Sequence, residues 1–216
     1  MDENHYIAFL LLMTKCLIVA ATATEIGPFM QSLEGKKEKP DILVTGVGMV
    51  ATAFALGRKL NNKAYDFAIN VGVCGSFSKN IPLGELVFIE RDVFYELGAE
   101  DDQHFIPIDE LGFGKAAFQA IRGFPKDLVS PFRQVRGLTV NSVHGNDRSI
   151  EQALERAQAE AESMEGAAFY YACEQVGLPC VQIRSISNYV EKRNRDGWQM
   201  GLAVKNLNDW LLSYFS

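Results

Sequence analysis

The stretch that decides the fold is residues 41–62, DILVTGVGMVATAFALGRKLNN, which passes from an apolar run through two glycines into a second apolar segment. The pattern predicts a strand over 41–47 and a helix over 49–62. Further strands are expected at 16–21, 66–73, 84–94, 134–143 and 179–186, and further helices at 24–34, 113–122, 147–156, 164–177 and 197–215. The alternation indicates an α/β layer fold with a largely parallel or mixed sheet. Residues 157–163 fit either an extended helix or a short strand.

Composition limits the class of protein. The 216 residues favour one domain, and 27 Asp and Glu against 21 Lys and Arg give a net charge of −6. This acidic balance argues against a nucleic-acid groove or an anionic membrane surface as partner. The four cysteines have no C-x-x-C spacing and are interpreted as reduced residues of a cytoplasmic protein. The three scattered histidines predict no metal site.

The N-terminus allows two interpretations. Residues 7–13 and 16–21 are apolar, as in a secretory signal, but Asp2 and Glu3 are acidic and Lys15 interrupts the run. No apolar stretch reaches the ~18 residues of a membrane span. We therefore expect residues 1–12 to be an extension outside the fold, with Met13 a plausible start, and residues 13–216 to form a single domain.

Two glycine-rich turns follow expected strands. Gly46-Val47-Gly48 matches a loose dinucleotide pattern, with Asp66 downstream, or is only a tight turn. Residues 72–75, Gly-Val-Cys-Gly, end another strand and let a flat ligand approach the backbone. Two such turns at strand ends favour a ligand crevice there. The long acidic segment 95–114 is expected to be an irregular loop, as a lid, a subunit contact or a solvated surface.

Three polar residues stand near expected element ends. Glu25 and Glu165 begin apolar helices, where the helix dipole alone accounts for an acid. Asn188 follows the last expected strand, where a helix cap would explain it equally well. Each of these residues, taken alone, is ambiguous.

Together the motifs are more specific. Residues 163–168, Ser-Met-Glu-Gly-Ala-Ala, residues 187–195, Ser-Asn-Tyr-Val-Glu-Lys-Arg-Asn-Arg, and the segment 96–100 resemble the purine nucleoside phosphorylase and nucleosidase superfamily. The likeness covers about residues 14–215. It is strongest to the methylthioadenosine/adenosylhomocysteine nucleosidase branch and, within it, to members that hydrolyse futalosine. The resemblance implies a three-layer sandwich with a central mixed sheet flanked by helices, a homodimer or larger homo-oligomer, and no metal or organic cofactor.

The resemblance also implies residue roles. Glu25 matches the base that positions and deprotonates the attacking water, and Glu165 matches the carboxylate that binds the ribose hydroxyls. Asn188 matches the residue that addresses the purine. Substrate-binding positions are matched by Cys74, Gly75, Val140 and Met164.

Two differences from relatives define the expected reaction. Adenine-specific relatives carry Asp where this chain has Asn188, whose NH2 group donates to the N7 and O6 acceptors of a 6-oxopurine. Hypoxanthine is therefore the expected leaving group. Hexameric phosphorylases carry a phosphate-binding Arg at the place of Asn70, and a Gly-Asp-Pro loop where this chain has residues 23–25, Ala-Thr-Glu. Hydrolysis is therefore expected rather than phosphorolysis.

The benzoate-bearing tail of futalosine requires a cation and an apolar wall. Arg193, Arg195 or Lys192 is the candidate cation, and Trp198 or Phe105 the candidate wall. A solvated basic turn is the simpler alternative.

Three other functions compete with this interpretation. One is an adenine nucleosidase or a purine phosphorylase, which Asn188 and Asn70 disfavour. Another is a nicotinamide-dependent oxidoreductase, but its glycine fingerprint normally follows the first strand. The third is a non-catalytic nucleotide-binding domain, which needs no water-activating base such as Glu25.

Overall fold

A computed structural model describes residues 15–61 and 64–215. The interval expected to lie outside the fold, residues 1–12, falls outside the described residues. Within them, no helix combines the length and the apolar character needed to span a membrane.

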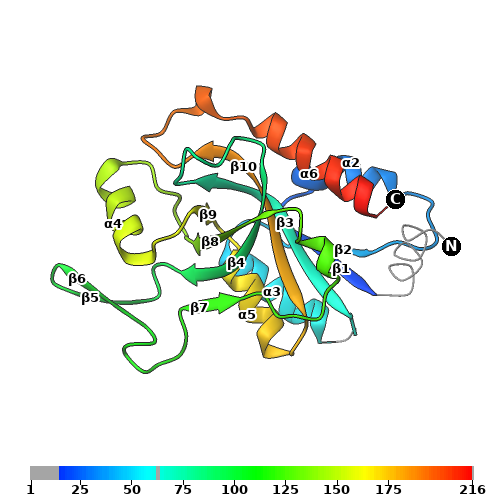
Figure 1. Cartoon of the computed structure of the whole chain (residues 1–216). Helices are drawn as coiled ribbons and strands as arrows, with labels where there is room; N and C mark the ends of the chain where they lie inside the picture. The colour runs from blue at the N-terminus through cyan, green and yellow to red at the C-terminus, as the bar shows by residue number, and fades with distance from the viewer. Residues whose placement is uncertain (1–14, 62–63, 216) are drawn as a thin grey trace.

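The centre of the molecule is an eight-stranded mixed sheet (Figure 1). Its path is β10-β4-β8-β9-β3-β1-β2, and β7 adds to β4. The strands are β1 (Cys16–Ala20), β2 (Asp41–Val44), β3 (Phe67–Ser76), β4 (Leu86–Phe94), β7 (Ala117–Gln119), β8 (Arg133–Thr139), β9 (Ala161–Ser163) and β10 (Cys180–Tyr189). The mixed sheet expected from the sequence is confirmed.

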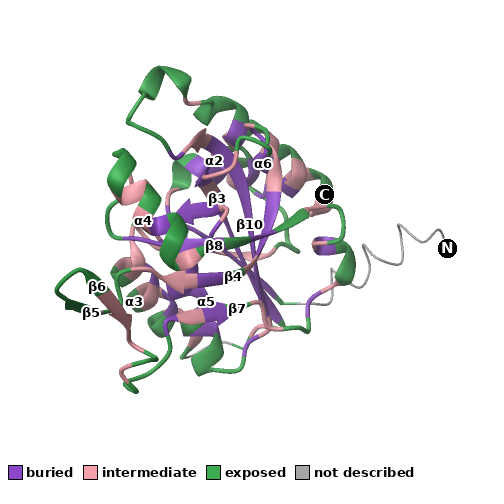
Figure 2. Ribbon diagram, turned by 60° about the vertical axis from the view of Figure 1, so that its left-hand side comes forward, coloured by how far each residue is buried: buried purple, intermediate pink, exposed green. Residues whose placement is uncertain are grey.

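Helices cover both faces of this sheet. On one face, α2 (Ala23–Ser32) and α6 (Met200–Tyr214) pack around a core that includes Phe29 and Leu207. On the other face, α3 (Met49–Leu60) and α5 (Gly166–Gln175) enclose a second core with Leu56 and Phe169. Figure 2 shows that the strands are buried and that they lie between helices whose outer faces are exposed. The three-layer architecture is therefore confirmed.

Part of the sheet closes on itself, which the sequence pattern did not indicate. Because β10 pairs with both β4 and β3, and β9 pairs with both β8 and β3, the strands β3, β10, β4, β8 and β9 form a ring. A helix, α4 (Asp147–Ala157), packs through Ala153 against Leu138 and Val140 beside this ring. The carboxyl ends of β3 and β10 thus meet the end of β8 around one region.

Two expectations were wrong. The helix expected over 113–122 is the short strand β7, which pairs with β4. Gly112, Gly114 and Gly123 have positive φ values around it, which interrupt a helix, and the open edge of β4 supplies hydrogen-bonding partners. The loop expected over 95–114 contains a hairpin of β5 (Gly98–Asp101) and β6 (His104–Pro107), which projects from the body in Figure 1.

The ambiguous segment 157–163 is resolved in favour of the strand. Helix α4 ends at Ala157, Gln158 adopts a left-handed conformation, and β9 begins at Ala161. Ala159 and Ala161 are both buried. The strand β10 extends three residues beyond the expected end at 186, so Asn188 is a strand residue and not a helix cap.

Candidate active site

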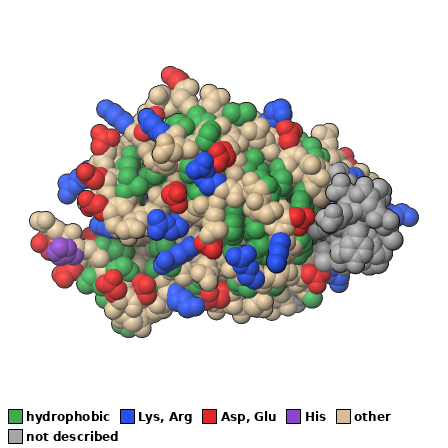
Figure 3. Space-filling view, in the orientation of Figure 1, with side chains coloured by type: hydrophobic (Ala, Val, Ile, Leu, Met, Phe, Trp, Pro, Cys, Tyr) green, Lys and Arg blue, Asp and Glu red, His purple; other side chains and the backbone are tan. Residues whose placement is uncertain are grey.

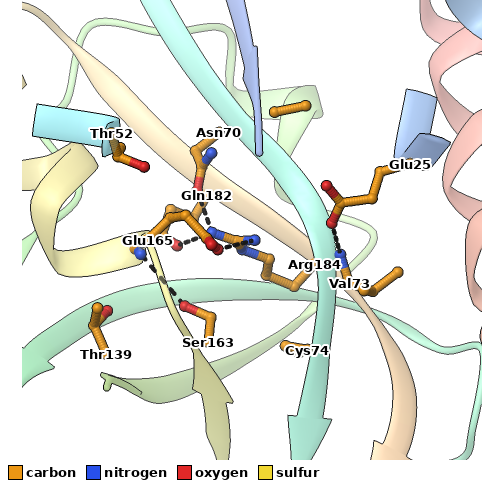
Figure 4. A network of polar contacts seen from close by, with 12 residues as sticks. Glu25, Thr52, Asn70, Val73, Cys74, Thr139, Ser163, Glu165, Gln182 and Arg184 are labelled. Carbon is orange, nitrogen blue, oxygen red and sulfur yellow. Dashed lines mark hydrogen bonds and ion pairs between the residues drawn. The ribbon is translucent and has the colours of Figure 1, made fainter. Parts of the chain in front are cut away.

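Glu25 is fixed at the start of α2, and both oxygens of its carboxylate accept hydrogen bonds, of which Figure 4 shows the one from Val73. Oε2 accepts from the backbone N–H and the hydroxyl of Thr22, each at 3.0 Å. Oε1 accepts from the backbone N–H of Val73 at 3.1 Å. Glu25 is thus also bonded to Val73 on β3, 48 residues away in the sequence. This bond fixes the buried carboxylate against the strand.

A kink in α2 directs this part of the helix. Ile26 has non-helical angles, φ −125° and ψ 17°, and Pro28 follows it. The Asn208 side chain of α6 replaces the helical bond that would join Phe29 to Glu25: its Oδ1 accepts from the Phe29 N–H at 3.0 Å, and its Nδ2 donates to the Glu25 carbonyl at 2.8 Å. A buried amide therefore satisfies both backbone groups that the kink releases.

Glu165 precedes α5 and lies on the other side of the same region. Its Oε1 accepts from the Gly48 N–H at 3.0 Å, and its Oε2 is 3.5 Å from Nη1 of Arg184. Gly46 and Gly48 have φ values of 89° and 96°, which favour glycine. The Gly-x-Gly turn thus presents a backbone donor to a carboxylate.

Arg184 is 1% exposed and lies between the two glutamates, as Figure 4 shows. Its Nη2 donates to Oδ1 of Asn70, whose Nδ2 donates to the Val19 carbonyl at 3.0 Å. Among the described residues, its Nε is the one fully buried side-chain nitrogen or oxygen without a hydrogen bond. A buried guanidinium beside Glu165 offsets that carboxylate's charge.

Gly72 is required where Glu25 and Arg184 approach the backbone of β3. A Cβ atom at this position would lie 2.7 Å from Oε1 of Glu25 and 2.7 Å from Nη1 of Arg184. The close approach of both side chains to the backbone of β3 therefore depends on the missing side chain.

The buried carboxylate of Asp92 is connected to this network through Gln182. Asp92 accepts from the Thr139 hydroxyl at 2.8 Å and from Nε2 of Gln182 at 3.1 Å. Burial raises the pKa of Asp92 to about 6, while these hydrogen bonds and the Arg184 charge oppose the rise. Gly166 makes room for it, since a Cβ there would lie 2.0 Å from Oδ2 of Asp92.

The other end of the site lies where β3 and β10 end. Asn188 is the strand partner of Gly75, and a bulge between Ile186 and Asn188 alters the register there. A Cβ at Gly75 would lie 3.2 Å from Nδ2 of Asn188 and 2.8 Å from Val190. Cys74 is buried, and burial raises the pKa of its thiol to about 12, so it contributes backbone and packing rather than a thiolate.

The hydrogen bonds of Asn188 limit what its amide offers. Oδ1 accepts from the Ser187 hydroxyl at 2.8 Å, and Nδ2 donates to the Tyr189 carbonyl at 3.1 Å. One of the two amide hydrogens is therefore engaged, and one is left for a ligand. That this NH2 group serves two acceptors of the base stays a prediction, and in this structure one of its hydrogens is bonded to the chain itself.

Val140 and Met164 lie near the same strand ends. The Val140 N–H donates to the Ser163 carbonyl at 3.0 Å, and its side chain is fully buried. Met164 is half-buried between Ser163 and Glu165. Both residues lie beside the turn that carries Glu165. The N–H of Val140 is already bonded to Ser163.

A second buried pair lies at the same strand ends. His144 donates its backbone N–H to Oε1 of Glu162 at 3.1 Å, and Nδ1 of its ring contacts Oε2. Its ring packs edge-on against Tyr95, with 5.2 Å between centroids, and lies 6.4 Å from the Phe77 ring. Burial raises the pKa of Glu162, and the bonds from His144 oppose the rise.

The candidate tail-binding residues are spread out. Arg193 and Arg195 are exposed, and the Arg193 guanidinium lies 5.7 Å from the Trp198 ring centroid. Phe105 instead lines a pocket of about 300 Å³ between hairpin β5–β6 and α4, where Arg156 lies 4.9 Å from its ring centroid. Because Trp198 does not line that pocket, the two expected walls belong to different places.

Arg184, Asp92, Asn208 and the His144–Glu162 pair were not assigned roles from the sequence. The signal for Arg184 was present, since a charged residue inside the apolar run 179–186 must be paired when the strand is buried. Asn208 carried no such signal, because its partners lie 179 and 183 residues away.

The chain belongs to the phosphorylase superfamily, whose family model matches residues 22–216. Among its relatives, the futalosine hydrolase of Streptomyces coelicolor is 33% identical over 181 residues, which cover 78% of this chain and 75% of that protein. The futalosine hydrolase of Acidothermus cellulolyticus is 30% identical over 213 residues, covering 89% and 87%.

Solved structures agree on the fold. The futalosine hydrolase of Helicobacter pylori superposes with a TM-score of 0.78 at 16% identity, covering 93% of this chain and 97% of that one. A 5′-methylthioadenosine/S-adenosylhomocysteine nucleosidase from Colwellia psychrerythraea, in complex with adenine, gives a TM-score of 0.75 at 22% identity, covering 94% of each chain. Membership of this superfamily excludes the dinucleotide-dependent oxidoreductase.

Proposed function

We propose that this protein hydrolyses the N-ribosidic bond of futalosine and releases hypoxanthine and dehypoxanthinyl futalosine, a reaction of menaquinone biosynthesis. The observation that carries the proposal is the pair of buried carboxylates, Glu25 and Glu165, held on either side of Arg184 beside residues 72–73 of β3. The relatives named as futalosine hydrolases, at 30–33% identity, support the choice of substrate.

The chemistry needs two differently placed acids. Cleavage of an N-ribosidic bond resembles glycoside hydrolysis, with an oxocarbenium-like transition state. Glu25, whose oxygens are oriented by Thr22 and Val73, positions the water and takes its proton. Glu165, oriented by Gly48 and Arg184, accepts hydrogen bonds from the ribose hydroxyls, with Met164 beside the sugar.

The base must leave as negative charge builds on it. Asn188 has one amide hydrogen free, and we assign that hydrogen to N7 of the purine. The backbone around Cys74 and Gly75, together with the Val140 segment, forms the surface beside the base. An amide donor needs no perturbed pKa to act, which suits a 6-oxopurine.

Water is favoured over phosphate as nucleophile. Asn70 is 1% exposed and both atoms of its amide are engaged, with Arg184 and with the Val19 carbonyl, so its side chain is not free to bind phosphate. The Glu25 carboxylate repels an incoming anion at the place where water attacks.

The test is the release of free base, followed by chromatography, from futalosine, inosine and methylthioadenosine, with and without phosphate. We expect hypoxanthine from futalosine at a rate that does not depend on phosphate, and we expect Glu25→Gln and Glu165→Gln to abolish it without unfolding the protein. Release of adenine from methylthioadenosine alone, or a fully active Glu25→Gln variant, would contradict the proposal.

The tail of futalosine is assigned to the turn that carries Arg193 and Arg195. The stacking of Arg193 on Trp198 supports this assignment, since it places a cation on an apolar wall. Arg193→Ala and Arg195→Ala are each expected to raise KM for futalosine and to leave KM for inosine unchanged. Equal KM values for wild type and variants on futalosine would remove the assignment.

We further propose that residues 13–216 act as one domain and that the chain forms a homo-oligomer. The exposed apolar side chains Val50 and Phe54 on α3, 78% and 67% exposed, support association. On the face that Figure 3 shows, Lys, Arg, Asp and Glu are interspersed, with no large patch of one sign. Light scattering of the purified protein gives the molar mass that tests this; a monomer at micromolar concentration would contradict it.

A further inference from the structure

We propose that His144, oriented by Glu162, is the specificity residue that reads the N1–H group of a 6-oxopurine. The inference rests on the proposed function, because it takes hypoxanthine as the leaving base. Its starting point is Asn188, which has one free amide hydrogen and therefore reads only one acceptor of the base. The N1–H group of the six-membered ring needs another partner.

The strand pairing places that partner. Gly75 on β3 is flanked by Asn188 on β10 and by Glu162 on β9, its partners in the two ladders. Directly paired residues point to the same face of a sheet, so Asn188 and Glu162 lie on one face, about two strand spacings or ~10 Å apart. Gly75 between them carries no side chain, and the side chains of Asn188 and Val190 pack over it, 3.2 Å and 2.8 Å from where a Cβ would lie.

His144 extends from Glu162 into this region. Both oxygens of Glu162 accept from His144, one from the backbone N–H and one from Nδ1. A carboxylate that accepts on both oxygens fixes the proton on Nδ1. The other ring nitrogen, Nε2, is then a bare acceptor in the neutral imidazole.

Nε2 is also available. In the part of the chain that the structure describes, no hydrogen bond involves this atom, and it is not among the fully buried atoms that lack a partner. The His144 side chain is 8% exposed, and its ring is clamped between Tyr95 and Phe77. The fixed ring therefore presents Nε2, which is an acceptor when the imidazole is neutral, to accessible space.

This acceptor distinguishes the two purine types. Hypoxanthine carries a hydrogen on N1 and donates to Nε2, whereas N1 of adenine is an acceptor and leaves two lone pairs opposed. A buried polar mismatch of this kind weakens binding about tenfold or more. The selection is thus independent of the contact that Asn188 makes to N7. Glu162 is the positioning residue, since it acts through the His144 tautomer.

Titration calorimetry with the free bases tests the assignment. The wild type is expected to bind hypoxanthine at least tenfold more tightly than 1-methylhypoxanthine, which lacks the N1–H, and more tightly than adenine. His144→Phe keeps the ring packing and is expected to weaken hypoxanthine about tenfold while leaving 1-methylhypoxanthine unchanged.

A double variant controls for the Glu162 carboxylate, whose charge His144→Phe leaves without a partner. Combining His144→Phe with Glu162→Gln removes that charge, and the same loss of preference is expected. Glu162→Gln alone is expected to lower the preference for hypoxanthine, because an amide donates to Nδ1 as readily as it accepts from it, while the affinity for adenine does not fall.

Equal binding of hypoxanthine and 1-methylhypoxanthine by the wild type, or an unchanged preference in the folded variants, would overturn the assignment. Preferential binding of hypoxanthine without any turnover of futalosine would instead contradict the proposed function.

Discussion

Adding one methyl group at Gly72 tests how the two glutamates are held. In Gly72→Ala, the new Cβ would lie 2.7 Å from Oε1 of Glu25 and from Nη1 of Arg184, about 0.7 Å inside the 3.4 Å at which ordinary contacts begin. If Oε1 retreats by that distance along the bond from Val73, the 3.1 Å hydrogen bond lengthens to about 3.8 Å and is lost. A misplacement near 1 Å at a reacting group costs about 10²-fold in rate.

We therefore expect kcat for hypoxanthine release to fall between about tenfold and a hundredfold, and the free energy of unfolding to fall by about 1–3 kcal/mol through overpacking. Base release by chromatography and urea denaturation measure the two effects. The matched control is Gly57→Ala, at an exposed position within α3 where an added Cβ meets nothing within 4 Å. A wild-type kcat in Gly72→Ala, or an equal loss in Gly57→Ala, would refute this account of the site.

Three other substitutions test the supporting network. Asp92 has a pKa raised from 3.8 to about 6, so its contribution to stability is present below pH 4 and is lost as the pH rises through 6, about 3 kcal/mol in all. Asp92→Asn should therefore gain about 1 kcal/mol relative to wild type between pH 5 and pH 7 in urea denaturation, and a constant difference would contradict the raised pKa. Asn208→Ala leaves the Phe29 N–H and the Glu25 carbonyl unpaired, so it should lose about 1–3 kcal/mol of stability together with kcat, and Asn208→Ala with wild-type kcat would show that the kink does not position Glu25. Arg184→Met leaves the Glu165 carboxylate buried without its cation and should cost about 3–5 kcal/mol, measured by the same denaturation; a loss below 1 kcal/mol would show that Gly48 alone satisfies Glu165.

Much of the fold followed from periodicity and turn chemistry. Buried strands such as 16–21 and 179–186 have no charge or a single one, and Gly46 and Gly48 mark a strand-to-helix turn. The pattern could not reveal that β10 pairs on both sides and closes a ring, because register across strands is decided by tertiary packing. The same reason explains β7, whose residues are acceptable helix formers until an unpaired strand edge is available.

The candidate site was predicted unevenly. Glu25, Glu165 and Asn188 stand in motifs that point to them, and the structure brings Glu25 and Glu165 to opposite sides of one cation. Residues that support them from distant segments, such as Asn208, give no local signal because hydrogen bonds over large sequence separations have no period.

The most direct test of the central claim is the mass of the sugar product formed from futalosine in ¹⁸O-labelled water with phosphate present. Hydrolysis through a water held by Glu25 predicts dehypoxanthinyl futalosine that carries one ¹⁸O atom, and no sugar phosphate. An unlabelled sugar 1-phosphate as the product would contradict the account, since it would mean that phosphate attacks beside the Glu25 carboxylate.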